Sequence, residues 1–233
     1  MKKMKLNKFR VLLIVLAITL FVTITLAWIF YTDLPYEFWR LTISRLGGNL
    51  IRDDIENPIG PNKISSLIFT IGLSICGVIC LLLLIFTIVD FKKKQYRWTN
   101  LFCFISMAIG AFFIGIPRDH DTLSILHYVG VGVFILSFLL FNSIAQFYHR
   151  RKEIIKRGLN FWDVFISMLL IIIVVVHVIT FILVWINPAH GESLRIWNAL
   201  SQKAVVIVCI GAIFFLDNED LVRPAKSKDE KIN

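Results

Sequence analysis

Six long apolar stretches dominate the pattern of the chain, and charged or proline-containing segments separate them. A helix needs roughly 20 mainly apolar residues to cross about 30 Å of hydrocarbon. Helices also satisfy their own backbone hydrogen bonds, which hydrocarbon requires. The stretches contain no acidic residue and cover residues 11–31, 64–89, 101–116, 123–147, 164–186 and 196–216. The pattern predicts an all-α, polytopic integral membrane protein with six transmembrane helices in one bundle.

The segments between these stretches are short, with one exception at residues 32–63. Pro35, Pro58 and Pro61 prevent this segment from forming one continuous helix. Within it, residues 38–46 are predicted to form a short amphipathic piece on the membrane surface. We expect one membrane domain over residues 1–233, without a soluble domain, and a cytoplasmic tail at residues 217–233.

The basic residues indicate how the helices are oriented. Of the 25 Lys and Arg residues, 18 fall on the side of the amino-terminal tail and 7 on the other side, whereas the 16 acidic residues divide evenly. Positively charged loops stay in the cytoplasm, so both termini are predicted to be cytoplasmic and residues 32–63 to be outside. Because no retrieval or organelle signal is evident, we expect the plasma (cell) membrane.

Composition narrows the classes of partner and chemistry. The chain is 57% hydrophobic, and its four cysteines all fall inside the predicted helices, so they serve as packing residues rather than loop disulfides. Basic clusters at residues 92–94 and 149–152 directly adjoin predicted helices, which favours anionic lipid over nucleic acid as their partner. We expect membrane lipids as partners, and no cofactor or resident metal.

The polar residues of most interest gather at the outer ends of the helices, a region that we call the outer mouth. Its members from the loops and the fourth helix are Ser44, Arg45, Arg118, Asp119, His120 and His127. Arginine forms paired hydrogen bonds with phosphate, and carboxylates bind an amine or a metal. The cluster therefore suits a phospholipid headgroup. Asp119 and Asp121 with the two histidines suit a divalent ion. The alternative is a loop that is polar for solubility alone.

The outer third of the sixth helix adds a polar face to the outer mouth. Arg195, Asn198 and Gln202 are spaced by three and four residues and so share one side of a helix. Such a face lines a ligand site or forms a structural network between helices. His177, near the middle of the fifth helix, is either a proton relay or a hydrogen-bonded packing residue.

Two groups of short motifs resemble a known family. Residues 43–47, Pro61-Asn62 and residues 67–73 resemble the opening pattern of the domain-of-unknown-function 998 family, which is similar to the Frag–DRAM–Sfk group. Residues 115–119 and then 127–130 resemble the second pattern of the family. The resemblance implies a six-helix membrane bundle with a lipid-related role and brings no established reaction. The positions that match the family motifs are Ser44, Gly47, Asn62 and His127, and Gly47 would form a turn. The chain departs from the family at Arg45, where the family usually has an acidic or polar residue.

These observations lead to one preferred function and two alternatives. The preferred function is a non-enzymatic protein that binds or organises lipid through the outer mouth. The first alternative is a lipid-headgroup-modifying enzyme that uses His127 and Asp119. The second is a small proton-coupled transporter that uses His177.

Overall fold

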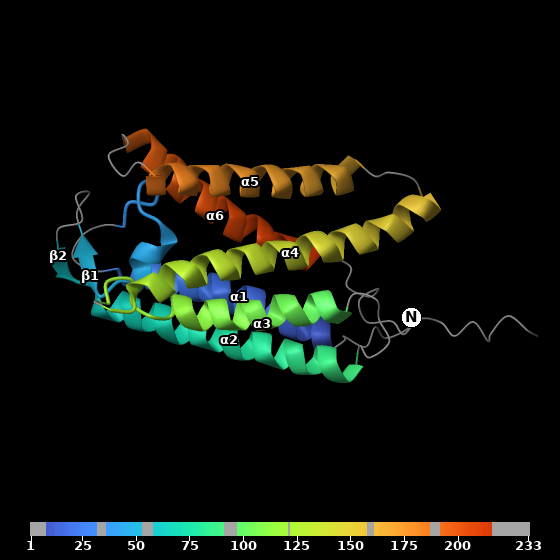
Figure 1. The fold of residues 1–233 in the computed structure, drawn as a ribbon, viewed down its shortest axis with the longest axis horizontal. Helices are drawn as coiled ribbons and strands as arrows, with labels where there is room; N and C mark the ends of the chain where they lie inside the picture. Colours follow the sequence, from blue (N-terminus) through green and yellow to red (C-terminus); the bar gives the residue numbers. More distant parts are fainter. Residues whose placement is uncertain are drawn as a thin grey trace, which may run out of the picture.

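Six α-helices make up most of the described chain in the computed structural model (Figure 1), which describes residues 8–31, 36–52, 58–90, 97–120, 122–157, 161–186 and 192–215. The helices are α1 (Lys8–Ile29), α2 (Lys63–Asp90), α3 (Arg97–Ile114), α4 (Ser124–Arg157), α5 (Phe161–Ile186) and α6 (Glu192–Phe215). The prediction of an all-helical architecture is confirmed. The predicted cytoplasmic tail lies outside the described residues.

Four of these helices are long and apolar enough to cross a membrane. Their apolar parts are Lys8–Ile29, Lys63–Val89, Ser124–Ser143 and Glu192–Phe214. Within the described residues, α3 and α5 contribute shorter apolar segments, Trp98–Ile114 and Met168–Val184. The chain is therefore compatible with an integral membrane protein.

The segment between α1 and α2, which we call loop 1 (residues 30–62), is more structured than a surface loop. It contains a turn at residues 38–40, a 3-10 helix η1 (Ile43–Gly47), and two short strands, β1 (Leu50–Arg52) and β2 (Pro58–Pro61). The strands pair antiparallel, with Leu50 opposite Pro61 and Ile51 opposite Gly60. This hairpin and η1 lie at one end of the helices (Figure 1).

Residues 38–46 do not form the single amphipathic piece that the sequence predicted. A turn interrupts the segment, and the 3-10 helix that follows is only five residues long. Ile43 and Leu46 are buried, so η1 packs inward against helices instead of lying on a surface. Contacts with α1, α2 and α6 surround η1.

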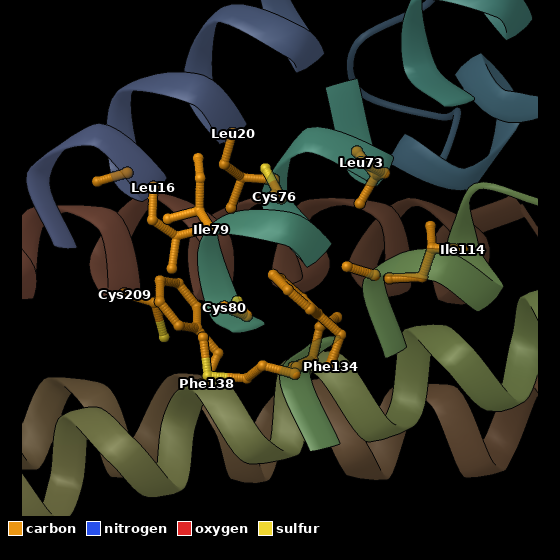
Figure 2. Packing of buried hydrophobic residues seen from close by; sticks show 14 of the residues in the cluster. Leu16, Leu20, Leu73, Cys76, Ile79, Cys80, Ile114, Phe134, Phe138 and Cys209 are labelled. Atoms are coloured by element: carbon orange, nitrogen blue, oxygen red, sulfur yellow. The ribbon is translucent and has the colours of Figure 1, made fainter. Parts of the chain in front are cut away.

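Helices α1 to α4 pack side by side in sequence order, whereas α5 contacts chiefly α6. Figure 2 shows buried side chains from five helices meeting in one core, among them Leu16, Cys76, Ile114, Phe138 and Cys209. All four cysteines are free and buried, as expected for packing residues. The core is continuous from α1 through α6.

Two glycines set the close contact between α3 and α4. A Cβ atom on Gly110 would lie 2.8 Å from the backbone nitrogen of Phe134, and a Cβ on Gly130 would lie 2.8 Å from that of Ile114. Small residues allow helix backbones to approach in membranes. The pair therefore fixes the relative position of the two helices whose connecting turn carries Arg118 and Asp119.

Candidate functional site

The outer mouth is built around η1, which side chains from the start of α2 hold in place. Asn62 Nδ2 donates to the carbonyl oxygen of Gly48 at 2.8 Å and to that of Leu46 at 3.4 Å. Ser65 Oγ also donates to Leu46 O, at 3.0 Å, and Ser66 Oγ donates to Gly47 O at 3.2 Å. Since buried carbonyl groups need partners, these three side chains satisfy the backbone of a 3-10 helix that would otherwise lack them.

Asp119, in the turn between α3 and α4, holds loop 1 from the other side. Its Oδ1 accepts a hydrogen bond from the backbone nitrogen of Asn49 at 2.8 Å, and its Oδ2 accepts one from Leu50 N at 2.7 Å. Both carboxylate oxygens therefore bind the backbone at the start of β1. Charge-assisted bonds of this kind are stronger than neutral ones, so Asp119 contributes to the shape of the outer mouth.

His127 lies in the first turn of α4 and is fully buried. Its Nδ1 is 2.8 Å from the carbonyl oxygen of Ile116. A carbonyl oxygen can only accept, so Nδ1 carries the proton and Nε2 carries the lone pair. The ring closes the α3–α4 turn and faces η1, because its Cε1 atom lies 3.5 Å from where a Cβ on Gly47 would be. Gly47 is also limited by Phe69, whose Cδ1 would lie 2.6 Å from that Cβ.

His120 and Arg118 belong to the same turn but have separate partners. The Nδ1 atom of the exposed His120 accepts from the backbone nitrogens of Thr122 at 3.4 Å and Leu123 at 3.3 Å, which caps the start of α4. Arg118 Nε donates to the hydroxyl of Tyr128 at 2.9 Å. The guanidinium group of Arg118 is thereby fixed beside the mouth.

Arg45 and Arg118 come from different segments, η1 and the α3–α4 turn. Both side chains are half-buried. The bonds of Asp119 to Asn49 and Leu50 hold the turn that carries Arg118 against the segment that follows Arg45. The structure thus brings two arginine-bearing segments together at the outer mouth.

Several buried polar atoms around η1 have no hydrogen-bond partner within the described part of the chain. They are the hydroxyl of Tyr31, Oδ1 of Asn62 and Nε2 of His127. A buried polar group without a partner costs roughly 1–3 kcal/mol. The outer mouth therefore has hydrogen-bonding capacity that no described residue uses.

The polar face of α6 splits into an exposed and a buried part. Arg195 is exposed, whereas Asn198, Gln202 and Ser201 are buried. Gln202 Oε1 accepts from the backbone nitrogen of Ile43 at 2.9 Å, which joins α6 to η1. Of the residues predicted on this helix, the structure connects Gln202 directly to the outer mouth.

Lys203 forms a contact that the sequence did not single out as a site. Lys203 is buried, with only 5% of its surface exposed. Its Nζ donates to Leu41 O at 2.5 Å and to Ala199 O at 3.3 Å. The ammonium also lies 4.9 Å from the ring centroid of Phe38 and 5.6 Å from that of Tyr36, a cation–π arrangement. Burial raises the pKa of Tyr36, so its hydroxyl stays protonated and donates to Leu41 O at 2.8 Å.

His177 is apart from the outer mouth, between α5 and α6. Its Nδ1 lies 3.1 Å from the hydroxyl of Ser201, and Thr180 Oγ1 lies 3.1 Å from the same hydroxyl. Ser201 Oγ also donates to Asn198 O at 3.0 Å. These contacts make a polar seam in an otherwise apolar helix pair.

The metal hypothesis has little geometric basis in the described residues. Among them, no group of three or more His, Cys, Asp or Glu side chains could hold a metal ion. Asp121 lies outside the described residues, and both oxygens of Asp119 already bind backbone nitrogens.

Comparisons with protein-family models, with curated proteins and with solved structures found no match for this chain. The functional argument therefore rests on the geometry of the outer mouth alone.

Proposed function

We propose that this protein crosses the membrane six times and binds the phosphate-bearing headgroup of a membrane lipid at the outer mouth. A location in the cell membrane, with both termini in the cytoplasm, is part of this proposal. The binding site consists of Arg45 and Arg118, and the buried Asn62 and His127 lie against η1, which carries Arg45.

The arrangement of helix ends supports six crossings. Asn62 precedes α2, Asp119 precedes α4 and Gln202 follows the start of α6, and all three bind loop 1. Consecutive helices therefore alternate in direction, since the odd-numbered helices end where the even-numbered ones begin. The 18 residues of α3 reach about 27 Å, close to the hydrocarbon thickness, and the 26 residues of α5 exceed it.

The observation that carries the binding proposal is the contact between the two segments that hold Arg45 and Arg118, because Asp119, next to Arg118, binds the backbone nitrogens of Asn49 and Leu50. A guanidinium group offers a planar fork of donors that matches phosphate oxygens. Two such groups, half-buried beside a membrane-facing bundle, fit an anionic phosphodiester at the level of the headgroups. Asp119, the neighbour of Arg118, already binds two backbone nitrogens of loop 1 through its carboxylate.

The test is the lipid content of purified protein, measured by mass spectrometry after mild detergent extraction. The variant Arg45→Gln/Arg118→Gln should lose about tenfold or more of the bound phospholipid, because charge-assisted bonds contribute about 1.5–3 kcal/mol each. The matched control is Lys8→Gln/Arg10→Gln, which removes two charges at the other end of α1. Equal lipid content in all three proteins, or no enrichment in the wild type, would exclude the proposal.

The two alternative functions receive less support from the geometry. For the enzyme, His127 would act as a base through Nε2, but its ring is fully buried. For the transporter, His177 would relay protons, but its contacts to Ser201 join two neighbouring helices. Membership of the domain-of-unknown-function 998 family, with its lipid-related role, agrees with the proposal and remains a prediction.

A further inference from the structure

The turn at residues 38–40 of loop 1, which we call the tip, carries an exposed tryptophan. Trp39 is 66% exposed, whereas Tyr36 is 8% exposed. The Trp39 ring packs edge-to-face on Phe38 at 5.4 Å between centroids, and Phe38 lies 5.5 Å from Trp28 at the outer end of α1. Three aromatic rings thus form a row that runs from α1 out to the tip.

This row continues the apolar surface of helices that are long enough to cross a membrane. At the outer end of α1, Trp28 is 44% and Ile29 is 67% exposed, and near the start of α6, Trp197 is 60% exposed. Tryptophan is enriched where the hydrocarbon meets the headgroups. The tip therefore lies beside a surface whose composition is that of a membrane interface.

A charged group next to Trp39 makes the tip amphipathic. Arg40 NH1 lies 3.2 Å from Glu37 Oε2, and Arg40 Nε lies 3.2 Å from Glu192 Oε1 at the start of α6. These side chains remain partly exposed, which suits the aqueous side of the interface. The ring and the ion pairs are adjacent in the chain and have opposite preferences for lipid and water.

We propose that the tip of loop 1, residues 38–40, inserts the Trp39 ring into the outer leaflet, at the boundary between headgroups and acyl chains. The partner is the bulk lipid surface, so the contact does not depend on which headgroup the outer mouth binds. It does rest on the proposed membrane crossing. Insertion fixes loop 1, and with it Arg45, at the depth of the lipid phosphates.

The test uses the full chain in phosphatidylcholine vesicles with brominated acyl chains, which quench nearby tryptophan fluorescence. Two single-tryptophan variants retain Trp39 or Trp98, the other tryptophans being changed to Phe. Trp98, at the other end of the bundle and 76% exposed, reports whether the protein is in the membrane at all. We expect blue-shifted emission from Trp39, with stronger quenching by bromine near the carbonyl end of the chain than by bromine near the methyl end.

Red-shifted emission from Trp39 that aqueous iodide quenches and brominated lipid does not, with Trp98 quenched by lipid, would overturn the insertion alone. Absence of lipid quenching for both residues would overturn the membrane crossing as well.

A cysteine pair tests the same point without removing several tryptophans. All four native cysteines are buried, so Trp39→Cys and Glu37→Cys add the reactive thiols. Glu37, with a side chain 52% exposed, is the control on the aqueous side. Glu37→Cys should react with a charged maleimide, whereas Trp39→Cys should react only with a lipid-soluble one. Equal reaction of both variants with the charged reagent would contradict the proposal.

Discussion

Gln202 on α6 accepts a hydrogen bond at 2.9 Å from the backbone nitrogen of Ile43, although 159 residues separate the two in the chain. Both residues are buried. The contacts of α5 and α6 with the first four helices are fewer than those among α1 to α4, and this bond and the Lys203 contacts add to them at the outer end of the bundle.

Replacing Gln202 by Leu should lower the free energy of unfolding by about 2 kcal/mol, since it leaves a buried N–H without an acceptor. Unfolding in mixed micelles with increasing denaturing detergent measures the change. Gln202→Glu keeps an acceptor oxygen for the Ile43 N–H and should lose less. A Leu variant as stable as the wild type would mean that the bond does not stabilise the bundle.

Asp119 should stabilise the fold, because its carboxylate accepts two backbone hydrogen bonds from loop 1. The change Asp119→Ala removes two bonds to backbone nitrogens and should cost about 2 kcal/mol, measured in the same assay. Asp119→Asn retains one acceptor oxygen and should fall between Ala and wild type. Glu37→Ala, which breaks an exposed ion pair, should cost well under 1 kcal/mol. If the two alanine variants are equally stable, the bonds between Asp119 and loop 1 do not stabilise the fold.

Two glycines on α4 provide a matched test of the α3–α4 contact. Gly130→Ala places a Cβ against the backbone of α3, which overpacks the contact and should cost roughly 1–3 kcal/mol. A Cβ on Gly132 meets nothing within 4 Å, so Gly132→Ala should be neutral or stabilising by up to about 1 kcal/mol. Thermal unfolding in detergent distinguishes them. Similar melting temperatures would show that the helices can separate at no cost.

His127 should respond to substitution as a hydrogen-bond donor. His127→Leu leaves the carbonyl of Ile116 without its partner and should cost about 2 kcal/mol. His127→Asn, whose amide can replace Nδ1–H, should recover part of that stability. If both variants keep full stability while headgroup turnover on a lipid panel disappears in both, the enzyme hypothesis gains over the proposed function.

The seam between α5 and α6 predicts a small coupling energy. A double-mutant cycle of Thr180→Val and Ser201→Ala isolates the contact of their hydroxyls, 3.1 Å apart. Hydrogen bonds of this kind inside membranes average about 0.6 kcal/mol. A coupling near zero, combined with loss of pH-dependent transport in His177→Leu vesicles, would favour the transporter instead.

Hydropathy predicted the helices well because burial in hydrocarbon and helix formation demand the same residues. It placed the end of the fourth helix at residue 147, whereas α4 continues to Arg157. A helix that leaves the membrane keeps its hydrogen bonds in water, so its polar extension carries no apolar signal. The strands β1 and β2 were missed for a similar reason, since four residues or fewer give no clear period.

The site was harder to predict because its contacts join distant segments. Residue types alone pointed to Asp119 and His127 as ligand groups, but not to their backbone partners at Leu50 and Ile116. Lys203 was not among the predicted site residues. Nothing local in the sequence indicates that its ammonium would meet Phe38.

The contacts between loop 1 and α6 also constrain the order in which the chain can assemble. Loop 1 emerges from the ribosome early, whereas Gln202 and Lys203 are synthesised much later. Gln202 accepts a hydrogen bond from Ile43, and Lys203 donates one to Leu41. Contacts between such distant segments form late, because the intervening chain must be closed first. Helices α1 to α4 can therefore pack while the outer mouth is still incomplete. Loop 1 gains its last partners only after α6 has been synthesised.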